Sequence, residues 1–131
     1  MAFTLFGCGG SGSSNEITES SDFAPNSIIG VTYATITSGG GEFAKTGSYL
    51  VQFKNDGTYI LDGDGINVVN SSGTYIYNKD SSNGATISIV DNLLGVAVYN
   101  LQLNALGKGT YKLTASLLPD AYQIGDFEIA Q

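Results

Sequence analysis

The sequence contains no histidine and a single cysteine, and these absences exclude several classes of chemistry. Without histidine, neither a Ser-His-Asp nor a Cys-His catalytic arrangement can form. The usual ligand sets for zinc, copper and iron are missing for the same reason. One cysteine cannot form an intramolecular disulfide. No apolar run reaches the roughly 18 residues that a transmembrane helix needs.

The charge balance limits the partners that the chain can bind. Five lysines are its only cationic side chains, against twelve Asp and Glu, and the formal net charge is −7. Phosphate contacts need clustered cations, so we expect no nucleic-acid partner. The same deficit argues against binding to anionic membrane surfaces. Because we find no nucleophile with a neighbouring base, we predict that the protein is not an enzyme and has no cofactor.

Apolar residues at alternate positions mark strands through most of the chain. In the stretch 47–62, Tyr49, Val51 and Phe53 alternate along one strand, and Asn55-Asp56-Gly57 supplies residues suited to a tight hairpin turn. The opening signature Gly-[Ser/Thr]-Tyr occurs at four glycines: Gly47, Gly57, Gly73 and Gly109. This pattern of alternating apolar residues and turn residues is typical of antiparallel strands joined by short turns.

Eight segments show such strand patterns, and no stretch of 10–15 residues shows the apolar spacing of a helix. The short connections predict an all-β fold, a single antiparallel up-and-down eight-stranded barrel, because closure removes exposed edges. A two-sheet β-sandwich is the alternative way to bury the same faces. The predicted strands span residues 28–37, 47–54, 58–61, 73–78, 85–90, 96–103, 109–117 and 123–130.

Details of these strands are also predicted. Gly39-Gly-Gly41 should break the first strand, and Pro119-Asp120 should end the seventh. Leu117 should face inward with the rest of the seventh strand. One core should contain six apolar residues from inward faces: Phe53, Ile87, Leu101, Tyr111, Leu113 and Phe127.

The N-terminal segment, residues 1–26, differs in composition from the rest. Leu5-Phe-Gly-Cys8 resembles the lipobox of bacterial lipoproteins, preceded by a short apolar stretch such as a truncated signal would leave. Gly9 to Ser14 forms a flexible Gly/Ser tether, and an acidic polar stretch follows. The resemblance implies lipidation at Cys8 and a lipid-anchored or extracellular place in a bacterial cell envelope, with membrane attachment only through that lipid.

The barrel domain is predicted over residues 27–131. Its run of Gly-Thr-Tyr strands separated by Asn-Asp-Gly-like turns is similar to small bacterial lipocalin-like barrels over residues 28–130. The first strand carries Gly30-Val-Thr-Tyr33 where lipocalins usually carry Gly-x-Trp. The resemblance implies a central cavity for a small apolar ligand and no catalysis.

Two sets of residues are candidates for binding. A row of tyrosines could line a ligand pocket, or could serve only cross-strand packing; these are Tyr49, Tyr59, Tyr75, Tyr99 and Tyr111. The loop Asp62-Gly-Asp64-Gly-Ile-Asn67 carries oxygen ligands that calcium accepts, although it departs from the EF-hand pattern. The alternative is a polar turn that uses Asp and Gly for their backbone conformations.

The sequence therefore predicts a non-enzymatic, envelope-associated binding module that holds a small apolar ligand. The alternative is a structural or interaction protein of the envelope, which assembles by adding its N-terminal strand, residues 2–6, to the sheet edge of a neighbour. The size of the barrel interior separates these hypotheses, because large inward side chains fill an eight-stranded barrel and small ones leave a cavity.

Overall fold

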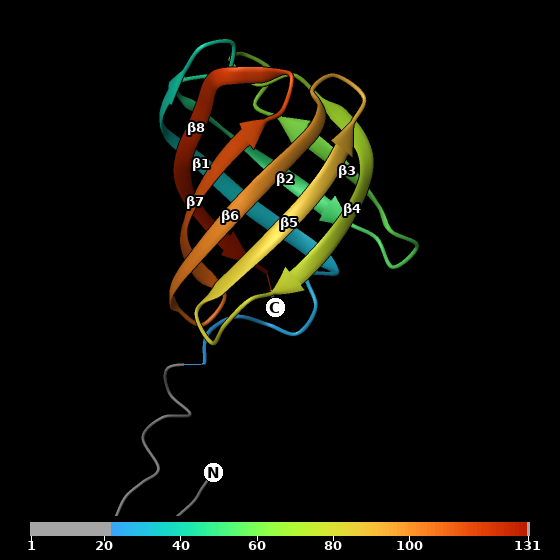
Figure 1. Cartoon of the computed structure of the whole chain (residues 1–131), viewed down its shortest axis with the longest axis vertical. Coiled ribbons are helices and arrows are strands. Elements are labelled where there is room, and N and C mark those ends of the chain that lie inside the picture. The colour runs from blue at the N-terminus through green and yellow to red at the C-terminus, as the bar shows by residue number, and fades with distance from the viewer. Residues whose placement is uncertain (1–21, 131) are drawn as a thin grey trace, which may run out of the picture.

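The computed structural model describes residues 22–130. They form a closed barrel in which each strand pairs antiparallel with its neighbour along the chain and β1 pairs with β8 (Figure 1). The predicted up-and-down barrel is therefore confirmed in preference to the sandwich. The strands are β1 Gly30–Gly40, β2 Gly47–Phe53, β3 Thr58–Gly63, β4 Ser71–Lys79, β5 Gly84–Asp91, β6 Gly95–Ala105, β7 Lys108–Ala115 and β8 Leu118–Ile129.

Cross-strand pairs of an aromatic residue and a glycine recur around the barrel. Tyr111, for example, lies opposite Gly125, where an added Cβ would be 2.8 Å from the Tyr111 ring. Glycines opposite large rings let a sheet curve tightly, and the rings cover the exposed backbone. Two glycines of the Gly-[Ser/Thr]-Tyr signature, Gly73 and Gly109, take part in such pairs. The other pairs are Phe53 with Gly30, Tyr49 with Gly63, Tyr59 with Gly73 and Phe127 with Gly109.

The predicted core is confirmed, since all six of its residues belong to one buried cluster. The prediction for Leu117 was wrong, because this side chain is 75% exposed. β7 ends at Ala115, and the chain turns at residues 116–117 before the alternation can place Leu117 inward. Pro119-Asp120 lies inside β8 rather than ending β7. Proline is tolerated there because the first residues of a strand need not donate to the sheet.

The predicted break at Gly39-Gly-Gly41 was also wrong for its first two residues. β1 continues to Gly40, because the long β8 reaches far enough to pair Gly40 with Tyr122. A Cβ on Gly40 would lie 2.6 Å from the Tyr122 ring, so the glycine here permits close contact instead of interrupting the strand. The bulge in this pairing, between Ile36 and Ser38, absorbs the change of register.

Residues 22–29 cross one end of the barrel, which we call the closed end, among the turns β4–β5 and β6–β7 (Figure 1). Ala24 N–H donates to Ser82 O over 2.9 Å, and Gly107 N–H donates to Phe23 O over 3.4 Å. Ile28 is only 1% exposed and inserts into the core. The predicted domain boundary at residue 27 thus lies within a segment that packs against the barrel.

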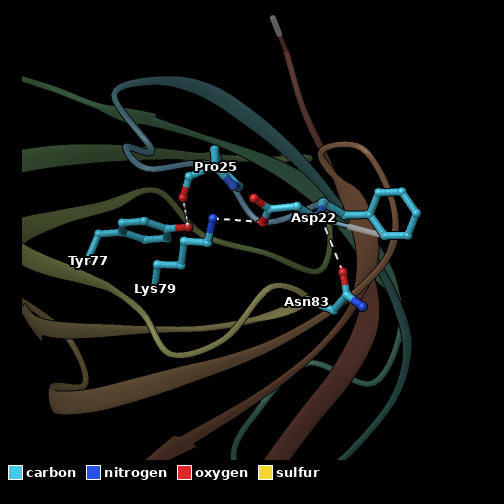
Figure 2. Close-up of polar contacts among 6 residues, drawn as sticks. Asp22, Pro25, Tyr77, Lys79 and Asn83 are labelled. Atoms are coloured by element: carbon cyan, nitrogen blue, oxygen red, sulfur yellow. Dashed lines mark hydrogen bonds and ion pairs between the residues drawn. The ribbon is translucent and has the colours of Figure 1, made fainter. Parts of the chain in front are cut away.

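Polar contacts also hold this segment to β4 and the turn after it (Figure 2). The Tyr77 hydroxyl donates to Pro25 O over 2.6 Å, and Lys79 Nζ lies 2.8 Å from Asp22 Oδ1. Phe23 N–H donates to the side chain of Asn83 over 3.3 Å. Backbone and side-chain bonds together fix the segment as a cover over the closed end.

The barrel wall is weakest between β3 and β4. These strands share four residue pairs, from Thr58 with Thr74 to Leu61 with Ser71. Next to the Thr58–Thr74 pair, Tyr75 N–H donates to Gly57 O, and no further β3–β4 pair is formed within residues 22–130. Closure elsewhere pairs both sides of each strand, and strand addition needs an unpaired edge. The assembly hypothesis therefore stays a prediction, with the end of β4 as its remaining edge in the described chain.

Candidate functional site

The opposite end of the barrel, which we call the open end, contains a cavity of about 160 Å³. Three loops surround it, β1–β2, β3–β4 and β5–β6, and the inward faces of the strands form its floor. Val69 and Leu93 are mostly exposed, so the cavity opens to solvent between the loop tips. Its lining consists of Glu42, Phe43, Ala44, Tyr49, Leu61, Asn67, Val68, Val69, Ser71, Ile89, Asp91, Leu93, Leu94, Tyr99, Leu113 and Gln123.

The rest of the barrel interior is filled. Deeper inside, among Val51, Phe53, Leu101 and Phe127, a void of about 30 Å³ remains, which suffices for about one water molecule. A shallow depression of about 300 Å³ lies on the outer wall and is lined by Asp126 and other exposed polar groups. We take the open-end cavity as the candidate site, because bound ligands are usually held in concave, mainly apolar surroundings.

Three tyrosine hydroxyls and one amide form a connected network at the cavity floor, which we call the tyrosine network. Tyr111 donates to Gln123 Oε1 over 2.8 Å, and Tyr49 shares its single proton between Tyr111 Oη and Gln123 Oε1, both 3.1 Å away. Tyr99 must therefore be the donor in its 3.2 Å contact with Tyr49. The last hydrogen bond of the network joins Gln123 Nε2, the donor, to Ala44 O over 3.4 Å.

Burial keeps these tyrosines protonated. Removal from water raises the pKa of Tyr49 and Tyr99 well above the ordinary value, and raises the pKa of Tyr111 to about 12. The pKa of Tyr59 is raised first by burial and then by its hydrogen bond to the Asp91 carboxylate. These four hydroxyls therefore stay protonated, and able to donate hydrogen bonds, above the pH at which an exposed tyrosine ionises.

Asp91 is the buried carboxylate of the site, at 4% exposure. Its Oδ1 accepts the N–H groups of Leu93, at 2.8 Å, and Leu94, at 3.1 Å, which shapes the β5–β6 turn. Its Oδ2 accepts the hydroxyls of Tyr59 and Ser71, the latter at 2.9 Å. Four donors aimed at both oxygens match the ionised form, which has no proton to donate.

Sequence reasoning missed Asp91, although a signal was present. Ile87, Ile89 and Asp91 occupy alternate positions on the inward face of β5. Asp91 followed by Asn92 also suits a turn, and we therefore ended the predicted strand at residue 90 and did not continue the inward alternation to Asp91. The burial of Phe43 in the β1–β2 loop was missed as well, because a single apolar residue in a polar loop shows no alternating pattern from which burial could be predicted.

The five predicted ligand-binding tyrosines are divided between two regions. Tyr49 and Tyr99 line the cavity, while Tyr111 and Tyr59 reach its floor through the hydrogen bonds described above. Tyr75 lies elsewhere. Its hydroxyl donates to Lys54 O over 2.7 Å, and its ring packs against that of Phe53, with 4.8 Å between the two ring centroids. Ligand contact by these tyrosines stays a prediction, and Tyr75 lies outside the cavity in which it could occur.

The predicted metal ligands belong to the β3–β4 loop. Asp64 Oδ1 accepts the N–H groups of Ile66, Asn67 and Val68 at 2.8–3.1 Å, and this lowers the pKa of Asp64 to about 2. The carboxylate therefore stabilises the turn itself. Asp62 is exposed on β3, and Asn67 lines the cavity. Within residues 22–130, no three His, Cys, Asp or Glu side chains gather as metal ligands would.

The predicted lipidation site, Cys8, and the predicted N-terminal strand lie outside the described residues. Among residues 22–130 there is no helix with the length and apolar character needed to cross a membrane. Comparisons of the chain with protein-family models, curated proteins and solved structures gave no match. The open-end cavity is therefore the feature of the described structure that bears on function.

Proposed function

We propose that the protein is a non-enzymatic binding module whose open-end cavity holds a small, mainly apolar molecule. The observation that carries this proposal is a preformed cavity of about 160 Å³ at one end of an otherwise filled barrel. Apolar cavities of roughly 150 Å³ in protein cores bind benzene. The ligand should therefore be about as large as one aromatic ring with a short substituent.

The composition of the lining supports the same proposal. Phe43, Leu61 and Leu113 supply apolar walls, and the tyrosine network supplies polar atoms at the floor. A few fixed polar groups within apolar walls orient a ligand, while the walls provide most of the free energy of binding. Because hydrogen bonds within the protein hold the tyrosine hydroxyls, the cavity is preorganised and a ligand need not order it.

Toluene binding tests the proposal. We expect toluene to shift backbone amide resonances around the cavity and to raise the melting temperature of the wild-type protein. Leu94→Trp should abolish both effects by filling the cavity, because Leu94 lines it. Leu106→Trp is the matched control, since Leu106 is exposed in the β6–β7 turn at the closed end. Equal responses in the two variants, or no response in the wild type, would exclude the cavity as a binding site.

We further propose that the module is tethered to a bacterial cell envelope by a lipid on Cys8. The lipobox-like residues Leu5 to Cys8 and the Gly/Ser stretch after them support this proposal. The point at which residue 22 meets the barrel agrees with it, because this point is at the closed end and leaves the cavity unobstructed.

Cell fractionation tests the tether. Expressed from its native gene in its native host, the wild-type protein should sediment with membranes, and Cys8→Ser should appear in the soluble fraction. Ser11→Ala, in the same segment, is the control and should behave as the wild type. Equal partition of the wild type and Cys8→Ser would show that the lipobox resemblance is coincidental.

A further inference from the structure

The lining of the open-end cavity carries negative charge and contains no cationic side chain. Two carboxylates, Asp91 and Glu42, are part of its lining, and no lysine is. All five lysines lie within residues 22–130, and two of them pair with Asp22 and Glu128 near the closed end. Within the described chain no ion pair reaches Asp91. Its four hydrogen-bond donors are neutral groups, so they solvate the charge without cancelling it.

Burying an unpaired charge is unfavourable, and a cation brought close to it recovers part of that cost. The path from the cavity to the Asp91 charge is the Ser71 hydroxyl, which lines the cavity and donates to Asp91 Oδ2 over 2.9 Å. Since the Ser71 proton is committed to Asp91, its oxygen is left as an acceptor. A nearby carboxylate makes that oxygen a stronger acceptor.

The tyrosine network also leaves a hydrogen-bond acceptor at the cavity floor. Tyr99 gives its proton to Tyr49, so the lone pairs of Tyr99 Oη receive no hydrogen bond from any other residue of the described chain. Tyr99 lines the cavity, as do the rings of Tyr49 and Phe43. Both hydroxyl acceptors and aromatic faces favour a cation over an anion.

The rim of the cavity repeats the charge of its floor. Asp62 and Asp64 on the β3 side and Asp120 at the start of β8 lie at the open end, where Lys45 is the single lysine of the described residues. Carboxylates of one sign around a cavity raise the local concentration of cations and lower that of anions. The rim therefore favours the same class of ligand as the cavity interior.

We infer that the cavity selects a small organic cation, an apolar body that carries one ammonium group. The ammonium would lie toward Ser71 and Tyr99, with the Asp91 carboxylate behind Ser71, and the apolar body would lie against Leu61, Leu113 and Phe43. This inference rests on the proposed function, because it assigns a ligand class to the same cavity.

Three ligands of one shape and different charge test the inference: benzylamine, toluene and benzoate at pH 7. We expect benzylammonium to bind at least about tenfold more tightly than toluene, and benzoate most weakly, by calorimetry or amide resonance titration. Asp91→Asn should bring the affinity for benzylammonium close to that for toluene. Glu42→Gln should lower the affinity less, and Asp56→Asn, in the distant β2–β3 turn, should leave it unchanged.

The outcomes separate the inference from the proposed function. If toluene binds as tightly as benzylammonium and Leu94→Trp removes both, the cavity binds ligands but the preference for cations is wrong. If none of the three ligands binds, the proposed function itself fails. Should Asp91→Asn not fold, Glu42→Gln and the order of the three ligands on the wild type still decide the matter, because Glu42 is exposed and makes no hydrogen bond in the described structure.

Discussion

The two ends of the barrel begin from the same alternating strands and are completed in different ways. At the closed end, residues 22–29 cover the strands, and Ile28 adds an apolar side chain to the core. At the open end the covering loops contribute Phe43 and Leu94, but polar groups, Asp91 and Gln123, occupy inward positions. Apolar groups pack in many arrangements, whereas these polar groups stay in fixed hydrogen-bonding positions.

This difference explains why a cavity persists at one end only. At the closed end, residues 22–29 lie across the barrel and place the apolar side chain of Ile28 in the core, and hydrogen bonds hold them there. The loops at the open end are held by carboxylates, Asp64 in the β3–β4 loop and Asp91 in the β5–β6 turn, so they cannot collapse inward without losing hydrogen bonds. Stability at the closed end thus depends on burial, and at the open end on a polar network.

Alkaline pH should affect stability most, through the tyrosines of the open-end network. Unfolded tyrosines ionise near pH 10, while Tyr111 in the fold has a pKa of about 12 and Tyr49, Tyr59 and Tyr99 are also raised. Above pH 10 the unfolded state binds fewer protons than the native state, so the free energy of unfolding falls with pH. Their contribution is fully present below pH 10 and is lost as pH rises through the folded pKa values.

The slope should reach about 1.4 kcal/mol per pH unit for each of these tyrosines. Urea unfolding between pH 8 and 11.5 measures it. Tyr111→Phe is the control, because removing one titrating hydroxyl should remove the contribution of one tyrosine from the slope of the free energy of unfolding against pH. A stability that stays flat over this range would show that the tyrosine hydroxyls are not buried as described.

Ile28→Ala tests the closed end. Ile28 is 1% exposed in the covering segment, so we expect the free energy of unfolding to fall by about 2–5 kcal/mol. Ile29→Ala is the matched control, since its side chain is 56% exposed, and should cost less than about 0.5 kcal/mol. Chemical denaturation measures both. Equal effects at the two positions would mean that residues 22–29 do not cover the barrel in solution.

Tyr49→Phe tests the open-end network with little change of volume. The Tyr99 hydroxyl would lose its acceptor, so we expect a cost of about 1–3 kcal/mol in the free energy of unfolding. Tyr33→Phe should change stability little, because the Tyr33 hydroxyl makes no hydrogen bond in the described structure and its side chain is 53% exposed. If both substitutions are neutral in denaturation experiments, the network contributes nothing to the fold.

Thr32→Val gives the smallest expected effect and the opposite sign. Thr32 Oγ1 is the single buried side-chain oxygen or nitrogen without a hydrogen-bond partner among residues 22–130, and it lies in β1 toward the closed end. Valine has nearly the same shape and no hydroxyl to desolvate, so stability should rise by about 1 kcal/mol. Thr35→Val, on the outer face of β1, is the comparison. A loss of stability on Thr32→Val would indicate that this hydroxyl does have a partner.

Much of the fold was predictable from the sequence, because alternation and turn residues are local signals. Tyr49, Val51 and Phe53 show their inward face directly, and hairpin-length connections predict the order of the strands. Errors arose where a partner strand overrode a local signal. Gly40 continues β1 because it pairs with Tyr122 of β8, and no residue close to Gly40 in the sequence predicts that pairing.

The candidate site was less predictable for a physical reason. Its cavity depends on how far three loops stand from one another, and the hydrogen bonds that hold them join distant residues. Tyr59 and Asp91, for example, are 32 positions apart. The five tyrosines were proposed from their place at strand starts or within strands, but which of them share a hydrogen-bond network depends on the stagger of the closed barrel. Tyr75 carries the same signature as Tyr49 and lies in another region.

Both ends of the described part of the chain lie at the closed end of the barrel, away from the cavity. Asp22 meets Lys79 at the closed end, and the N–H of Ala130 donates to Val31 O at the same end (Figure 1). Anything joined to the chain before residue 22 or after residue 130 therefore meets the barrel at the end away from the cavity. An attachment on that side would leave the open-end cavity free for a ligand to enter.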